Sequence, residues 1–116
     1  MGESILKIKS YAFAVSIVKL SQRLVSVKKE YVLSKQLLRS GTAVGALIRE
    51  AEFGQSKADF IHKLSISLKE ANESLYWLDL LKDTKYIDEK QYKSLFELNK
   101  ELVAMLVSSI KTAKRK

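Results

Sequence analysis

The chain has 116 residues, of which 47% are hydrophobic and 29% charged, a composition that excludes a disordered chain and favours one folded domain over residues 1–116. It has no proline and only four glycines, so the turn residues that all-β and α/β folds require are scarce, and the absence of cysteine excludes disulfides and thiolate metal sites. The net charge is +8, of which residues 1–31 and 85–116 each carry +4. No apolar run approaches the roughly 18–20 residues of a membrane span, so we expect a cytoplasmic protein that does not enter a membrane.

The first predicted helix covers residues 4–27. Its apolar residues recur at spacings of three and four, which places them on one face of a helix. They are Phe13, Ile17, Leu20, Leu24 and Val27. The polar run of Lys28, Lys29 and Glu30 then predicts a short loop.

The second predicted helix, residues 33–53, carries Gly41 and Gly45 in its interior, with Ala43 and Ala46 beside them. A glycine inside a helix costs roughly 0.5–1 kcal/mol relative to alanine, so some other interaction must offset this loss. We therefore expect a neighbouring helix to approach closely over this surface.

The third and fourth predicted helices cover residues 57–83 and 89–112, and the basic residues beyond them are expected to fray. Ser56 and Asp88 are the predicted N-caps, each followed three residues later by a side chain that can return the hydrogen bond. Four amphipathic helices joined by short loops predict an all-α fold, an antiparallel up-down-up-down four-helix bundle.

Basic residues are the candidate nucleic-acid contacts. The antiparallel topology brings the start of the first helix and the end of the last helix to one pole, which gathers cations that are distant in sequence. The predicted contacts are Lys7, Lys9, Lys28, Lys29, Lys111, Lys114 and Arg115. Binding of RNA or DNA by these side chains would depend on phosphate contacts, with low sequence specificity and a steep dependence on salt.

The third helix carries more apolar surface than one face of a bundle can bury. Residues 75–81 are apolar almost all round the helix, and we expect Tyr76, Trp77 and Leu80 to form an oligomer interface. The alternative is a protein-interaction scaffold, in which this surface binds a different protein and no nucleic acid is bound.

No catalytic or metal-binding constellation is present in the sequence. His62 is the only histidine, and the chain lacks the Glu-x-x-His motifs of di-metal bundles. We predict no enzymatic activity, no metal and no cofactor. The charged residues of the second and third helices are instead predicted to form structural ion pairs, buried between those helices. They are Arg39, Arg49, Glu50, Glu70 and Glu73.

The segment from Gln36 to Leu81 resembles a bacterial family of four-helix bundles that includes the proteins encoded by intervening sequences of ribosomal RNA genes. Three stretches carry the resemblance: residues 36–51 around the two glycines, residues 55–60, and residues 64–78 with Trp77. The accessory protein of diversity-generating retroelements is similar. The resemblance extends over nearly the whole chain.

This resemblance implies a basic bundle without known enzymatic activity that assembles as a ring-shaped homopentamer. The retroelement relative implies binding of RNA and DNA and a reverse transcriptase as a possible partner. The signature charged residues of the family match Arg39, Glu50 and Glu73 of this chain. Leu47 and Arg49 depart from the asparagine and alanine common at those positions, which leaves any shared role of a polar side chain there open.

Overall fold

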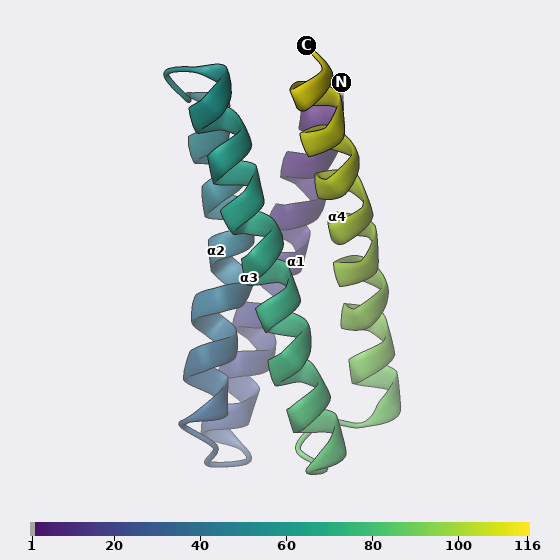
Figure 1. Cartoon of the computed structure of the whole chain (residues 1–116). Coiled ribbons are helices and arrows are strands. Elements are labelled where there is room, and N and C mark those ends of the chain that lie inside the picture. The colour runs from purple at the N-terminus through teal and green to yellow at the C-terminus, as the bar shows by residue number, and fades with distance from the viewer. Residues whose placement is uncertain (1) are drawn as a thin grey trace.

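The computed structural model describes the backbone of residues 2–116 and the side chains of residues 5–116, and over this range it contains four helices and no strand. The helices are α1 (Gly2–Ser26), α2 (Leu33–Glu52), α3 (Lys57–Asp83) and α4 (Glu89–Arg115). Successive helices run in opposite directions, as Figure 1 shows, and the molecule measures 47 × 22 × 20 Å. The predicted all-α, up-down-up-down architecture is confirmed.

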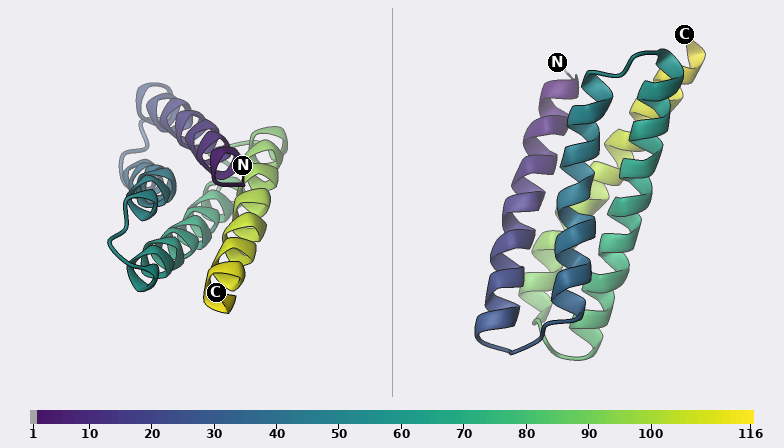
Figure 2. Two further views of the ribbon diagram at one scale, coloured as in Figure 1. Left: turned by 90° about the horizontal axis from the view of Figure 1, so that it is seen from above. Right: turned by 90° about the vertical axis from the view of Figure 1, so that its left-hand side faces the viewer.

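The two ends of the bundle hold different segments of the chain. We call the end that holds both termini and the α2–α3 loop the terminal pole, and the end that holds the α1–α2 and α3–α4 loops the loop pole (Figure 1). Each helix packs on its neighbour in sequence, and α4 also packs on α1. In both views of Figure 2, α4 is inclined to the other helices, so its C-terminal end leans toward the start of α3. This inclination opens the bundle at the terminal pole.

The core is a column of apolar side chains that follows the predicted helix faces. Phe13 and Ile17 of α1 are fully buried, as are Leu102 and Leu106 of α4. Val27, predicted as the last member of the α1 stripe, is 61% exposed because α1 ends at Ser26 and the chain turns there. The buried stripe of α1 therefore ends at Leu24, about one helical turn earlier than predicted.

Buried polar side chains form hydrogen bonds between specific positions of neighbouring helices. Ser67 Oγ on α3 donates to the carbonyl oxygen of Val44 on α2 at 2.8 Å. Asn99 Nδ2 on α4 donates to the carbonyl oxygen of Ala71 on α3 at 2.7 Å. Since an unpaired buried donor costs free energy, these bonds favour one register of α2 and of α4 against α3.

The glycines of α2 permit the predicted close approach, and the partner is α1. A Cβ atom placed on Gly41 would lie 2.8 Å from both Cγ1 and Cγ2 of Ile17, closer than side chains tolerate. A Cβ atom on Gly45 would lie 3.3 Å from Ser10 Oγ. The absence of side chains at these two positions therefore sets the separation between α1 and α2.

The helix ends follow the sequence only in part. Ser56 and Asp88 cap α3 and α4 as predicted, and Asp88 forms a full capping box with Gln91. At the start of α2 the cap is the buried carboxylate of Glu30, which accepts hydrogen bonds from the backbone N–H groups of residues 32, 33 and 34. The basic C-terminal residues continue α4 to Arg115 instead of fraying at residue 112.

Candidate functional site

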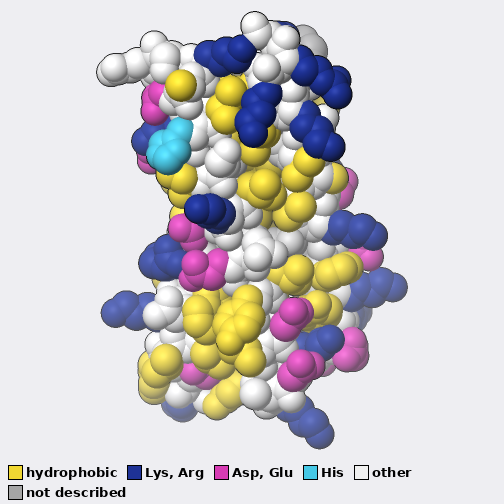
Figure 3. All heavy atoms as spheres, in the orientation of Figure 1, with side chains coloured by type: hydrophobic (Ala, Val, Ile, Leu, Met, Phe, Trp, Pro, Cys, Tyr) yellow, Lys and Arg dark blue, Asp and Glu magenta, His cyan; other side chains and the backbone are white. Residues whose placement is uncertain are grey.

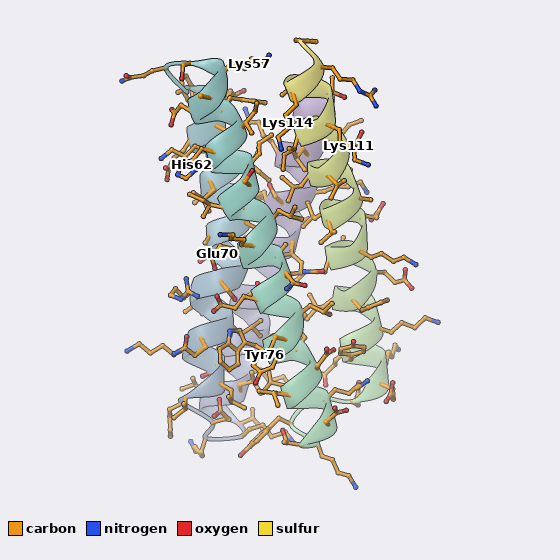
Figure 4. All side chains as sticks on the ribbon, viewed as in Figure 1. Lys57, His62, Glu70, Tyr76, Lys111 and Lys114 are labelled. Carbon is orange, nitrogen blue, oxygen red and sulfur yellow. The ribbon has the colours of Figure 1, made fainter. Side chains whose placement is uncertain are left out.

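The terminal pole carries a group of exposed cations from separate segments of the chain. Lys111, Lys114 and Arg115 extend from the last turns of α4, and Lys116 follows them. Lys57, in the first turn of α3, was not among the predicted contacts, yet the chain topology places it at the same pole (Figure 4). Figure 3 shows dark-blue side chains gathered around this end of the molecule.

Two of the predicted cations at this pole are already paired. Lys7 Nζ lies 3.0 Å from Glu52 Oε1, which joins α1 to the end of α2. Lys9 Nζ lies 3.2 Å from Glu101 Oε2 of α4. Both pairs compensate the lysine charge locally, so the cations at the end of α4 contribute most of the positive potential here.

The divergence of α4 leaves a hollow of about 630 Å³ at the terminal pole, which we call the terminal-pole pocket. Its walls come from all four helices, and its base is formed by the buried side chains of Leu6, Ile48 and Leu64. The remaining lining residues are Lys7, Glu52, Lys57, Phe60, Ser108, Ser109, Thr112, Ala113 and Lys116. An apolar base thus lies beneath a rim that carries lysine side chains.

The loop pole holds the two other predicted cations, Lys28 and Lys29. A smaller cleft of about 460 Å³ lies there between the two loops. It is lined by Arg23, Lys28, Lys82, Lys85, Tyr86, Ile87, Asp88, Glu89 and Gln91. Because the molecule is 47 Å long, Lys28 and Lys29 do not share a contact surface with Lys111. The seven predicted contacts therefore divide between two poles.

Arg39 of α2 makes the ion pairs expected between α2 and α3. Its guanidinium donates to both carboxylate oxygens of Glu70, at 3.3 and 3.4 Å, and to Glu73. The Trp77 indole N–H, 3.1 Å from Glu73 Oε2, and the guanidinium of Arg39 hold the pKa of Glu73 below its usual value. The same two carboxylates raise the pKa of Arg39. The Arg39 side chain is 52% exposed, so this network lies at the surface and not in a buried seam as predicted.

Arg49 and Glu50 do not complete such a network. Glu50 pairs across α2 and α3 with Lys63, at 3.1 Å. Arg49 forms no ion pair with the side chains of residues 5–116; its guanidinium carbon lies 5.9 Å from the centre of the Tyr11 ring of α1. The predicted ion pair of Arg49 is wrong, because this part of α2 turns that side chain toward α1 instead of α3.

The apolar surface of α3 is smaller than the sequence suggested. Tyr76 is 57% exposed, but Trp77 and Leu80 are half-buried, and Trp77 packs against the core. The rings of Tyr76 and Trp77 meet edge to face at 5.0 Å. Figure 3 shows a patch of hydrophobic side chains on this face of the loop-pole half of the molecule, where Figure 4 places Tyr76.

A second apolar surface, on α1, was missed. Ile5, Ile8 and Tyr11 are 50%, 68% and 61% exposed. Their spacing of three residues places them together on one side of the helix. The same spacing in the sequence could have revealed this surface.

A third hollow, of about 780 Å³, lies beside the α2–α3 loop, and each of its lining side chains is at least partly exposed. It is lined by Arg49, Glu50, Phe53, Gln55, Ser56, Asp59 and Lys63. No group of three or more potential metal ligands lies together among the described residues. No helix within the same range combines the length and the apolar character that crossing a bilayer requires.

Comparisons with known proteins identify a matching family and a solved structure with the same fold. The family model described as 23S rRNA-intervening sequence protein matches residues 3–108. A solved structure from Bacteroides thetaiotaomicron VPI-5482, described as a protein with unknown function from the S23 ribosomal protein family, shares 55% sequence identity with the chain. The match covers 96% of this chain and 99% of that one, with a TM-score of 0.94. A comparison with curated protein sequences finds no match.

Proposed function

Since the chain belongs to the 23S rRNA-intervening sequence protein family, we propose that it is a non-enzymatic, oligomeric basic protein that binds RNA or DNA through phosphate contacts. The observation that carries this proposal is the cluster of exposed cations at the terminal pole. Lys57, Lys111, Lys114, Arg115 and Lys116 form this cluster. None of them has an acidic partner within 4.0 Å among the described side chains.

Charge of this kind supports binding without sequence selection. Each phosphate that a lysine or arginine neutralises releases condensed counterions, so affinity falls steeply as salt rises. Lysine side chains on a helix end are long and flexible, and no helix or hairpin of the described bundle protrudes to reach base edges in a duplex groove. Phosphate contacts of this type fix position on a nucleic acid and carry no sequence information.

Self-association would multiply this charge. Five copies of a chain with net charge +8 would carry 5 × 8 = +40, which strengthens attraction to a polyanion. A closed ring requires two different surfaces on each subunit. Tyr76 with the half-buried Trp77 and Leu80 provides one such surface, and the exposed face of α1 provides the other. The proposed number of five subunits comes from the family resemblance.

Fluorescence anisotropy with an unstructured, labelled RNA tests the binding. We expect tight binding at low salt that weakens as salt rises from about 50 to 200 mM. Replacing Lys111, Lys114 and Lys116 with glutamine should weaken binding. The slope of log affinity against log salt should also become shallower, by up to about 0.7 for each phosphate that is no longer neutralised. The matched control replaces Lys90, Lys93 and Lys100, which are lysines of the same helix nearer the loop pole.

Two results would count against nucleic-acid binding through the terminal pole. The first is an absence of binding at low salt. The second is an equal reduction of affinity in the two triple variants, which would show that net charge matters and the location of the lysines does not.

The second candidate function is a protein-interaction scaffold, favoured by the exposure of Tyr76. In this case the α3 surface binds another protein, such as the reverse transcriptase that the retroelement relative suggests. Light scattering, which gives the oligomeric state, separates the two candidates when it is combined with the RNA-binding assay. A monomer that fails to bind RNA supports the scaffold.

A further inference from the structure

We propose that the terminal-pole pocket accepts an unpaired base of a nucleic-acid strand whose phosphates lie against the terminal-pole cations. This inference rests on the proposed function and narrows its substrate to nucleic acid with accessible, unstacked bases. It is carried by the shape and lining of the pocket and by the position of the charges around it.

The size and base of the pocket fit the flat face of a base. Its volume of about 630 Å³ lies within the ~300–1,000 Å³ typical of small-molecule sites. Leu6, Ile48 and Leu64, which form the floor of the pocket, are only 3%, 4% and 2% exposed. A sugar-phosphate backbone would lose its hydration there, whereas the faces of a nucleic-acid base are apolar and gain from leaving water.

The walls supply the other groups that recognise bases. Phe60 is the one aromatic residue in the described lining of the pocket, and it offers a ring on which a base can stack. Ser108, Ser109 and Thr112 of α4 line the opposite wall. A hydroxyl both donates and accepts hydrogen bonds, so these side chains can satisfy the edge of any base without selecting one.

The charges lie where the strand would run. Lys57 and Lys116 are on the rim, one from α3 and one from the end of α4. Among the described residues of the lining, Glu52 is the single acidic one, and its carboxylate is paired with Lys7 at 3.0 Å. A phosphate at the rim therefore meets lysines, while the repulsion from the acid is compensated.

The loop-pole cleft lacks this combination. It is smaller, at about 460 Å³, and its lining includes the exposed carboxylates of Asp88 and Glu89. Those carboxylates repel phosphate, and the cleft has no buried apolar floor other than Ile87. The third hollow, beside the α2–α3 loop, is larger, at about 780 Å³, but its lining includes Glu50 and Asp59 and no buried side chain. Of these three hollows, the terminal-pole pocket is therefore the one that combines a floor of three buried apolar side chains with lysines at its rim.

A duplex cannot place a base in the terminal-pole pocket unless one of its base pairs opens. Its bases are stacked and paired, and extruding one costs free energy. A single strand presents unstacked bases at little cost. Duplex binding would then depend on phosphate contacts alone, while single-strand binding would also gain from the pocket.

The experiment fills the pocket without changing any charge. Ala113→Leu adds aliphatic bulk to the lining from the last turns of α4 without adding an aromatic face, and Ala104→Leu is the matched control, an exposed alanine of the same helix that does not line the pocket. Dissociation constants are measured for an unstructured RNA and for a duplex of equal phosphate number, at one salt concentration. We expect Ala113→Leu to lower the ratio of single-strand to duplex affinity by about fivefold or more. The ratio for Ala104→Leu should stay at the wild-type value.

A second variant tests the stacking contact. Phe60→Leu keeps an apolar side chain but removes the aromatic face. A 2-aminopurine base in the single strand should change its fluorescence when it binds the wild-type protein, and this change should shrink in Phe60→Leu. The fluorescence of 2-aminopurine reports on the surroundings of the base itself, independently of affinity.

The outcomes separate the pocket from the proposed function. If Ala113→Leu leaves the affinity ratio unchanged, or the 2-aminopurine signal does not respond to Phe60→Leu, the pocket proposal is wrong while phosphate binding stands. If neither single strand nor duplex binds at low salt, the proposed function itself fails.

Discussion

The contact between α1 and α2 permits a quantitative test at Gly41. In Gly41→Ala the new Cβ atom would lie 2.8 Å from two carbon atoms of Ile17, a side chain that is fully buried. A β-branched side chain in a helix has one strongly preferred χ1 rotamer, so Ile17 cannot turn aside and the two helices must separate. Overpacking of this kind costs about 1–3 kcal/mol, while the better helix propensity of alanine returns up to about 1 kcal/mol. We expect a net loss of about 1–2 kcal/mol in the free energy of unfolding.

Gly45→Ala is the matched control, because it makes the same chemical change one helical turn away. Its Cβ atom would lie 3.3 Å from Ser10 Oγ and 3.5 Å from Ser10 Cβ, a contact that a small shift relieves. We expect its stability to equal that of the wild type or to rise by up to about 1 kcal/mol. Urea unfolding followed by far-UV circular dichroism measures both variants. Equal stability of Gly41→Ala and the wild type, or the same shift in both variants, would refute the close contact as the reason for the glycine.

Three further outcomes are expected from the helix ends and the surface network. Glu30→Ala removes a carboxylate that accepts bonds from three N–H groups of α2, and should lower the free energy of unfolding by about 1–2 kcal/mol in urea titrations. Lys85→Gly should raise it by about 0.5–1 kcal/mol, since Lys85 has a φ of 68°, a conformation that glycine adopts without strain. The bond from Trp77 and the pair with Arg39 lower the pKa of Glu73, so its contribution to stability is present above its unfolded value of 4.5 and is lost as pH falls through its folded value. Arg39→Gln should therefore lose less stability than the wild type between about pH 5 and pH 3, measured by thermal unfolding.

The parts of the fold that the sequence predicts well are those that depend on local rules. The periodicity of residues such as Phe13 and Ile17 reflects the geometry of a helix and needs no knowledge of the partner. The caps at Ser56 and Asp88 arise from side chains that reach only three residues along the chain. The role of Gly41 was also predictable from the sequence. A glycine inside a helix lowers helix stability, which indicates that another helix packs closely there, although it does not say which helix.

The helix ends at the loop pole show where local rules fail. Lys29 and Lys85 adopt positive φ angles of 57° and 68°, a conformation that usually selects glycine or asparagine. Lysine gives no such signal, so these turns were not predictable from residue type. The cap of α2 is also unusual, since Glu30 lies two residues before Val32, the position where a capping side chain is expected. Its buried carboxylate reaches forward to the backbone, which only the folded loop reveals.

The candidate site was predictable only as a collection of charges. The antiparallel topology follows from the loop lengths, and it correctly gathers Lys111 and Lys114 at the end that holds the N-terminus (Figure 4). The same topology places the start of the third helix, and with it Lys57, at this pole. Lys57 was missed because the prediction considered only the two basic segments of the sequence, and Lys57 lies outside both. The terminal-pole pocket depends on the inclination of α4, a property of packing over the whole helix that no short motif encodes.

The distribution of ion pairs distinguishes the sides of the bundle from the terminal pole. Along the sides of the bundle, basic residues meet acidic ones on neighbouring helices, as Arg39 does with Glu70 and Lys63 with Glu50. Such pairs reduce the field at the sides of the molecule. The cations at the end of α4 have no acidic residue in the last turns of their own helix, where negative helix-dipole charge also favours them. Positive charge is therefore left without ion pairs among the described side chains at the same end at which α4 leaves the bundle open, and a polyanion drawn there by this charge meets the apolar floor of the pocket.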